Sequence, residues 1–185
     1  NWVFVGSWHQ PNIDGIRRLV DSGLCNLDSR KVKLWILGSV GEPIKNFIQH
    51  FNKNDTVVQI MGESSDADIS NSISASTGII IPIWSGGGSN LKTAQALLSE
   101  KQIIATTFAF RGFENYVSES GVKIFDDSSH FVEELANQSF GNHKFIRTGV
   151  EKLKWENILK GLPPIVRSES VSYTHLRAHE TSKHL

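Results

Sequence analysis

Short apolar runs that alternate with stretches of helical periodicity constrain the fold of this chain more than any other feature. Such continuous runs are typical of strands that are buried on both faces of a sheet. The runs cover residues 2–5, 33–37, 56–61, 78–83, 103–106 and 122–125. Because strands that alternate with helices form parallel sheets, the pattern predicts an α/β fold: a doubly wound parallel sheet of about six strands with helices on both faces.

Helical patterns lie between these runs. Pro11 and Pro43 each open one, since the N–H that proline lacks has no partner in the first turn of a helix. Further helices are predicted over residues 66–75, 90–99, 129–137 and 148–160. Ligands of such sheets bind beyond the carboxyl ends of the strands. The expected binding edge therefore carries the glycines that follow the apolar runs, namely Gly6, Gly38, Gly62 and Gly86.

Length, charge and cysteine content exclude several classes of protein. The 185 residues suit one domain, and 19 Lys+Arg balance 19 Asp+Glu, so we expect no nucleic acid partner. The single cysteine, Cys25, excludes an internal disulfide and favours a reducing, cytoplasmic compartment. No apolar stretch is long enough to span a bilayer. Because the chain starts at Asn1 and its only methionine is Met61, we interpret it as a fragment that lacks its N-terminal part.

The last residues have a composition unlike the rest. Residues 172–181 hold two of the seven histidines and resemble the translated read-through of a sequencing adapter. His175 and His179 stand at a spacing that suits a metal on a helix, but we favour an accidental product of adapter codons. We therefore expect one domain over residues 1–167 and a non-native, disordered tail over residues 168–185.

A glycine-rich loop followed by a helix is the most informative segment for chemistry. Three consecutive glycines, Gly86–Gly88, cost conformational entropy, and without Cβ atoms they allow a ligand to approach the backbone. Ser89 or Asn90 is a suitable N-cap. The following helix is expected to place Lys92 and Gln95 on one face. Its expected buried residues are Leu91, Ala94, Leu97 and Leu98.

Lys92 lies in the first turn of that helix, where the helix dipole disfavours a cation. An anion at the same helix terminus would reverse this effect, because backbone N–H groups, the dipole and the ammonium group would converge on it. We therefore predict a diphosphate at this position. An exposed lysine behind a flexible loop is the alternative, and the residues alone leave both open.

Other motifs are absent or ambiguous. The chain has no P-loop, no G-x-G-x-x-G after its first strand and no C-x-x-C or H-E-x-x-H, so we expect no metal and no tightly bound cofactor. Ser89-x-x-Lys92 matches one motif of penicillin-recognising enzymes, but the strings S-D-N and K-T-G are missing. Asp66 and Asp68 form a D-x-D, which at a helix start is more simply explained by capping.

Four blocks together resemble a known family over residues 1–162. They are Phe4-Val5-Gly6-Ser7 with Pro11-Asn12, Leu34 to Gly38, Ile81 to Ala96 with Ile104-Ala105-Thr106-Thr107 and Arg111-Gly112-Phe113, and Trp155 to Leu159. The chain is similar to the C-terminal, donor-binding domain of GT-B glycosyltransferases of family four, the group one glycosyl transferases, in their glycine-rich loop subgroup. The resemblance implies a Rossmann-like domain, one half of a GT-B fold, whose N-terminal acceptor domain is missing.

The resemblance also implies roles for individual residues. The loop and helix start would hold the diphosphate or the donor sugar, and Lys92 would neutralise phosphate charge as the catalytic residue. Glu63 would lie near the base together with Gly62, and Ser7 would line the cleft together with Gly6. The implied donor-binding set is Gly6, Ser7, Gly62, Glu63, Gly86, Gly87, Gly88, Ser89, Asn90 and Gln95.

The chain departs from the family pattern at three places. Gly87 and Gln95 stand where many members carry two glutamates. The amide oxygen of Gln95 can still accept a hydrogen bond from a ribose hydroxyl, but this bond lacks the added strength that the charge of a carboxylate gives. Ser7-Trp8-His9 stands where a basic pair is common. His9 and Trp8 could each face the cleft or serve the fold.

We therefore expect a fragment of a retaining glycosyltransferase that binds a UDP- or GDP-linked sugar as its donor. The fragment alone is expected to bind nucleotide without turnover. Its acceptor would be a saccharide, a lipid or a small molecule, and a lipid acceptor would place the protein at the inner membrane face. The alternatives are a non-catalytic nucleotide-sugar-binding module, favoured by Gln95, and a nicotinamide-dependent enzyme, disfavoured by the missing glycine fingerprint.

Overall fold

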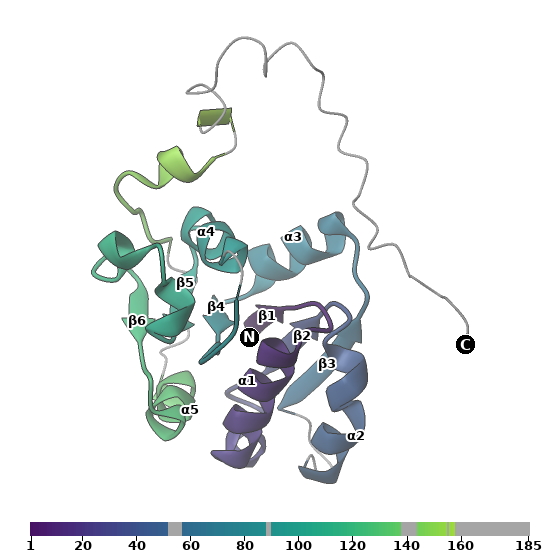
Figure 1. The fold of residues 1–185 in the computed structure, drawn as a ribbon. Helices are drawn as coiled ribbons and strands as arrows, with labels where there is room; N and C mark the ends of the chain where they lie inside the picture. Colours follow the sequence, from purple (N-terminus) through teal and green to yellow (C-terminus); the bar gives the residue numbers. More distant parts are fainter. Residues whose placement is uncertain (52–56, 88–89, 138–143, 155, 158–185) are drawn as a thin grey trace. The chain divides into compact units, whose positions relative to one another are not determined.

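The structure is a computed structural model that describes residues 1–51, 57–87, 90–137, 144–154 and 156–157. The chain divides into two compact units, Asn1–Glu151 and Lys152–Leu185. The first unit holds the sheet and the helices α1 to α5 (Figure 1). In the second unit the described residues comprise only the end of a 3₁₀ helix and a few residues beyond it.

A parallel sheet forms the centre of the first unit. Its strands follow the order β3-β2-β1-β4-β5-β6, and every neighbouring pair is parallel. They are β1 (Trp2–Val5), β2 (Leu34–Leu37), β3 (Val58–Gly62), β4 (Gly78–Ile81), β5 (Gln102–Ala105) and β6 (Val122–Ile124). β1, β4 and β5 consist almost wholly of buried residues, as strands covered on both faces require.

Helices cover both faces of this sheet, as the sequence pattern predicts. The helix α1 (Gln10–Asp21) contacts both α2 (Gly41–Phe51) and α5 (Ser128–Asn137) on one face. The helices α3 (Asp66–Ala75) and α4 (Leu91–Leu98) lie on the other face (Figure 1). Right-handed crossovers produce this division, because the chain moves outward from β1 through β2 to β3 and then returns past β1 to β4.

The strand order reverses between β1 and β4, and this position determines where a ligand can bind. The first half of the chain builds β1, β2 and β3 on one side, and the second half builds β4, β5 and β6 on the other. The loops that leave the carboxyl ends of β1 and β4 therefore diverge to opposite faces and leave a crevice between them. The fold prediction is confirmed, and it places the expected binding edge at this crevice.

Two predicted element boundaries are wrong for local reasons. The strand predicted to reach Ile83 ends at Ile81, because Pro82 has no N–H for the ladder, and the N–H of Ile83 turns back to the Ile81 carbonyl at 3.0 Å. The helix predicted over residues 148–160 is interrupted. Gly149 has φ +73°, and a 3₁₀ helix over Val150–Leu153 follows it. Trp155 and residues 158–160 of that prediction lie outside the described residues.

A buried arginine ties the C-terminal end of α4 to the sheet. Arg147 is 3% exposed, and its guanidinium donates to the carbonyls of Ser120 and Leu97 at 3.0 Å each and to that of Lys101. Burial lowers the pKa of this guanidinium below its usual value. Because helix C-termini leave carbonyls without backbone partners, Arg147 satisfies groups that would otherwise be buried and unpaired.

We expect Arg147→Met to lower the free energy of unfolding by about 1 kcal/mol. Losing buried hydrogen bonds costs about 1–3 kcal/mol, and relief of the desolvated charge offsets part of that cost. Chemical denaturation measures the change. Arg30→Met is the matched control, because Arg30 is exposed and its pairing with Asp28 lies at the surface. Equal stability of the Arg147 variant and the wild type would contradict this role.

Candidate functional site

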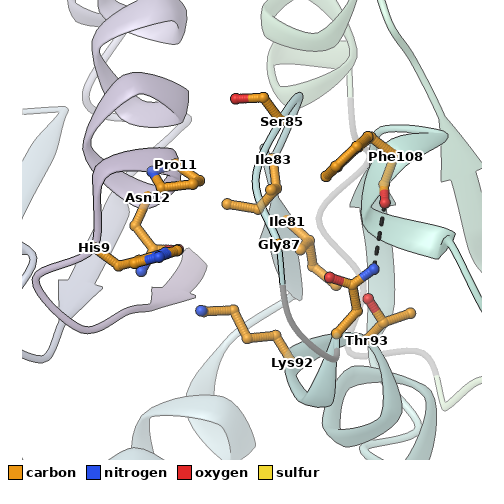
Figure 2. Close-up of a pocket in the computed structure, with 11 residues that line it drawn as sticks. His9, Pro11, Asn12, Ile81, Ile83, Ser85, Gly87, Lys92, Thr93 and Phe108 are labelled. Atoms are coloured by element: carbon orange, nitrogen blue, oxygen red, sulfur yellow. Dashed lines mark hydrogen bonds between the residues drawn. The ribbon is translucent and has the colours of Figure 1, made fainter.

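A cavity of about 220 Å³ opens between β1 and β4, at the point where the strand order reverses. Three segments enclose it: the start of α1, the chain after β4, and the start of α4 with the loop after β5 (Figure 2). Its lining residues are His9, Pro11, Asn12, Ile81, Ile83, Ser85, Gly87, Asn90, Lys92, Thr93 and Phe108. The N-termini of two helices therefore lie at the edges of one cavity.

The start of α1 forms one wall. Asn12 is 2% exposed and its Nδ2 donates to the Ser7 carbonyl at 2.8 Å, which holds the loop after β1 against the helix. His9 is the N-cap residue of α1 and makes no side-chain capping bond. Its imidazole is drawn at the cavity wall in Figure 2, opposite α4. His9, left open by the sequence, therefore faces the cavity.

The segment after β4 forms the floor of the cavity, and close packing fixes its course. Gly86 has φ +120°, and a Cβ there would lie 2.6 Å from Cγ of Pro11. Thr106 Oγ1 donates to the Ile83 carbonyl, so the neighbouring strand end holds this segment as well. No described atom lies within 4 Å of the position that a Cβ of Gly87 would take. Gly86 is thus required by the backbone, whereas Gly87 borders open space.

Lys92 supplies the positive charge of the site. Its side chain projects from α4 across the cavity toward His9 and Asn12 (Figure 2). Partial burial lowers the pKa of Lys92 below the usual lysine value. Among the described residues it has no hydrogen-bond or ion-pair partner. A desolvated ammonium group at the N-terminus of a helix is costly, and an anion in the cavity would remove that cost.

The start of α4 is held differently from the prediction. Asn90 is the N-cap residue but makes no side-chain capping bond. Its Nδ2 donates instead to the carbonyls of Phe108 at 3.3 Å and Arg111 at 3.2 Å. Thr93 is fully buried and donates to the Ala109 carbonyl at 2.6 Å. The first turn of α4 therefore depends on the loop after β5 for its position.

The buried face of α4 is also rotated from the predicted one. Leu91, predicted to be buried, is 60% exposed, and Ala94 and Leu98 are only partly buried. Leu97 is buried as predicted. The sheet-facing residues are Thr93, Ala96 and Leu97. Small side chains at Thr93 and Ala96 let the helix approach the sheet closely, which leaves Lys92 at the border of the cavity.

The structure brings together only some of the predicted donor-binding residues. Gly87, Asn90 and Lys92 line the cavity, and Gly6 and Ser7 lead into its α1 wall without lining it. Gln95 lines a second cavity of about 380 Å³ between α3 and α4, and shares a narrow space beside β4 with Lys92. Gly88 and Ser89 lie outside the described residues.

Gly62 and Glu63 lie apart from this cavity. They follow β3, an outer strand of the sheet that is separated from β1 by β2. Gly62 has φ +75°, and its carbonyl accepts a bond from the N–H of Gly38 at 2.7 Å. Both residues share the carboxyl edge of the sheet with the cavity, but neither lines it.

Sequence reasoning missed Asn12 and Phe108 as cavity residues. A buried asparagine one residue after a helix-opening proline is a recognisable signal, since buried polar side chains need partners. Phe108 gives no such signal, because only the packing of the loop after β5 brings it to the cavity. For Trp84 the sequence left open whether the side chain faces the cleft or packs in the core. In the structure Cζ of Arg18 lies 4.6 Å from the centroid of the Trp84 ring, and Nε1 of Trp84 donates to the Asp126 carbonyl at 2.7 Å.

The arrangement can bind a small anion. The N-terminus of α4 and the ammonium group of Lys92 provide donors and positive charge at one place. In the first turn of α1, Pro11 has no N–H, and the N–H groups of Asn12 and Ile13 donate to the His9 carbonyl at 2.9 and 3.2 Å. Within the described ranges no group of three His, Cys, Asp or Glu side chains could hold a metal ion. No helix within these ranges is long and apolar enough to cross a membrane.

The fold and this site define a Rossmann-like α/β domain with a crevice at the reversal of strand order. The family model of the group 1 glycosyl transferases matches residues 1–138. The chain therefore belongs to this family, and its fold is that of one half of a GT-B glycosyltransferase, as the resemblance predicts. A comparison with curated proteins finds no match.

Three solved structures are similar to this chain at low sequence identity. WaaG, a glycosyltransferase involved in lipopolysaccharide biosynthesis, has a TM-score of 0.55 at 11% identity, over 75% of this chain and 38% of WaaG. AviGT4, a glycosyltransferase involved in avilamycin A biosynthesis, has a TM-score of 0.45 at 12% identity, over 74% of this chain and 41% of its own. The pneumococcal O-GlcNAc transferase GtfA, solved with UDP and GlcNAc, has a TM-score of 0.48 at 13% identity, over 86% of this chain and 29% of its own. The chain thus spans less than half of each of these proteins.

Proposed function

We propose that this chain is the donor-binding part of a glycosyltransferase and holds a nucleoside-diphosphate sugar at the cavity between α1 and α4. One observation carries the proposal: the partly buried ammonium group of Lys92 projects into a cavity edged by two helix N-termini and has no partner among the described residues. Family membership supplies the class of ligand that fits an anion site at this place.

The proposed chemistry is transfer of the sugar from the nucleoside diphosphate to an acceptor hydroxyl. The bond from the anomeric carbon to the diphosphate oxygen breaks, a bond to the acceptor oxygen forms, and the acceptor proton passes to a base. Negative charge grows on the departing diphosphate, and fixed donors placed there stabilise the transition state. Lys92 and the N–H groups at the start of α4 would supply this stabilisation. Retention at the anomeric carbon follows from the family resemblance.

The rest of the donor would extend beyond the cavity. Its volume of about 220 Å³ is below the 300–1,000 Å³ of typical ligand pockets, which suits a diphosphate group with the remainder held elsewhere. Gln95 would accept a bond from the ribose, and Glu63 and Gly62 would lie toward the base. Either UDP or GDP satisfies these contacts.

A second domain would close the site. Trp8 and Leu91 are 65% and 60% exposed, and Met61 is 54% exposed. All three lie at the carboxyl edge of the sheet, Trp8 and Leu91 beside the loops that carry the site and Met61 near the end of the outer strand β3. Exposed large apolar residues at one edge are typical of a surface that another domain covers. The covering domain would bring the acceptor, a saccharide, a lipid or a small molecule. Cytoplasmic location, or the inner membrane face for a lipid acceptor, remains part of the proposal.

Gln95 favours a second candidate function, a nucleotide-sugar-binding module without transfer. An amide accepts a hydrogen bond with roughly half the strength of a carboxylate, so a weakened ribose contact fits a site that has lost activity. Gln95→Glu in the complete protein separates the two. Higher donor affinity without any transfer favours the binding module, and transfer by the wild type excludes it.

A thermal-unfolding titration of the 185-residue chain with UDP, GDP, ADP and NAD tests the proposal. A ligand at 100 times its dissociation constant stabilises by about 2.7 kcal/mol, which shifts the midpoint measurably. We expect a shift with one nucleoside diphosphate, which then identifies the base. A shift with NAD alone would overturn the assignment.

Gly87→Ala tests whether the loop is shaped for a ligand. Because no described atom lies near the new Cβ, we expect the unfolding midpoint without ligand to stay the same or rise slightly, since alanine restricts the unfolded chain. The affinity for the nucleoside diphosphate is expected to fall about tenfold, or 1.4 kcal/mol, because the methyl group occupies space at the cavity wall. Isothermal titration calorimetry measures the affinity. Unchanged binding would show that the ligand does not approach Gly87.

A further inference from the structure

Both flanks of the glycine-rich loop are tied to one segment after β5. On the near side, Arg111 Nη1 donates to the Gly86 carbonyl at 3.3 Å. On the far side, Asn90 Nδ2 donates to the Arg111 carbonyl at 3.2 Å and to the Phe108 carbonyl at 3.3 Å. Arg111 therefore contacts the chain just before the loop through its side chain, and the start of α4 through its backbone.

The segment that carries Arg111 is itself firmly held. It begins with the 3₁₀ helix η2 (Phe108–Phe110), in which Ala109 and Phe110 are buried. The Ala109 N–H donates to Thr106 Oγ1 at 3.1 Å, and its carbonyl accepts from Thr93 Oγ1 at 2.6 Å. This segment thus bridges the end of β5 and the buried face of α4.

The flat face of the Arg111 guanidinium also makes a contact, with an aromatic ring, that holds it in place. It lies over the Phe108 ring, with Cζ 4.4 Å from the ring centroid, and Phe108 is also one of the residues that line the cavity. Stacking on an aromatic ring orients the planar guanidinium and reduces the entropy lost when it bonds a carbonyl. The bond to Gly86 directs Arg111 to the protein backbone, so its geometry suits holding the loop more than binding a phosphate.

We infer that Arg111 is a positioning residue of the donor site, and this inference rests on the proposed function. By fixing the Gly86 carbonyl and the first turn of α4 together, Arg111 sets the distance between the Gly87 backbone and Lys92. That distance decides whether both reach the same diphosphate. Affinity for the phosphate part of the donor therefore depends on Arg111, whereas affinity for the nucleoside part does not.

Hydrogen exchange of the ligand-free chain tests the contact itself. Arg111→Met removes the donor to Gly86 and keeps the apolar stem over Phe108. We expect faster amide exchange in residues 86–91, with the peptides of β1 and β2 unchanged. Arg30→Met is the control, because Arg30 is exposed and pairs with Asp28 in the turn that precedes β2, away from the loop. Equal exchange in wild type and Arg111→Met would overturn the inference.

Calorimetric binding tests the role in the donor site. We expect Arg111→Met to weaken UDP or GDP, whichever the wild type binds, about tenfold, and to leave affinity for the matching nucleoside unchanged. Arg111→Lys keeps a donor and is expected to recover part of the loss. Equal losses for the nucleoside and its diphosphate would indicate general damage and overturn the inference. A wild type that binds no nucleoside diphosphate overturns the proposed function and the donor-site role, whatever the exchange shows.

Discussion

Lys92→Met should weaken binding of the nucleoside diphosphate by about 10- to 100-fold without lowering the stability of the ligand-free chain. A charge-assisted contact to phosphate is worth about 1.5–3 kcal/mol, which corresponds to this range. Methionine has a similar length and no charge, so it fills the space beside β4 that the lysine stem occupies. Removing a cation from the N-terminus of α4 also relieves an unfavourable dipole interaction.

The effect of Lys92→Met on the stability of the ligand-free chain should depend on pH. Burial lowers the pKa of Lys92 in the folded chain, so folding opposes its protonation. At neutral pH both states carry the proton and the cost to the folded chain is complete. As the pH rises through the lowered pKa toward the ordinary lysine value, the folded chain loses its proton first and the cost disappears. Any excess stability of Lys92→Met is therefore present at neutral pH and shrinks in alkaline solution.

Lys45→Met is the control for charge alone. Lys45 is exposed and lies in the first half of α2, so it resembles Lys92 in charge and in position on a helix. Calorimetry at two salt concentrations should show a large loss of affinity for Lys92→Met and almost none for Lys45→Met. The salt dependence of binding should also fall when Lys92 is replaced. Wild-type affinity in Lys92→Met would remove the observation on which the proposed function rests.

Local chemistry made much of the fold predictable. The helix expected over residues 66–75 has those bounds, because Ser65 and Asp68 form a reciprocal capping box, with the Asp68 N–H donating to Ser65 Oγ at 3.2 Å. This also confirms that the D-x-D aspartates serve a helix start. The strands were predictable for a similar reason, since buried β-branched runs such as Gly78–Ile81 have few alternatives.

Long-range partners account for the errors. The apolar residues between Leu91 and Leu98 lie on more than one face of the helix. The helical period alone therefore does not determine which face is buried. Thr93 can be buried because its hydroxyl donates a hydrogen bond to the Ala109 carbonyl. The side chain of Asn90 does not cap the helix and instead donates to a carbonyl of the same loop, that of Phe108. Those partners are distant in sequence, and no local signal marks them. The candidate site was thus predictable around Gly87 and Lys92, and the place of Asn12 after Pro11 offered a signal, but nothing in the sequence marked Phe108.

The architecture of the cavity also depends on one glycine inside a helix. Gly15 lies one turn after Asn12 in α1 and is buried against the segment that follows β4. A Cβ at Gly15 would fall well inside the van der Waals distance of the Pro82 carbonyl oxygen. The absence of a side chain therefore lets α1 approach β4, and this approach sets the width of the crevice between the start of α1 and the Ile83 segment.

Gly15→Ala should destabilise the chain by about 2 kcal/mol, although the same change stabilises most helices. Helix propensity favours alanine over glycine by about 1 kcal/mol. Overlap with a backbone carbonyl costs about 3 kcal/mol, since neither the helix nor the strand end can rotate away. The clash therefore outweighs propensity, and displacement of α1 should also weaken diphosphate binding. Denaturant unfolding of Gly15→Ala beside Gly87→Ala measures the difference, and a more stable Gly15→Ala would show that α1 is not in contact with the Pro82 carbonyl.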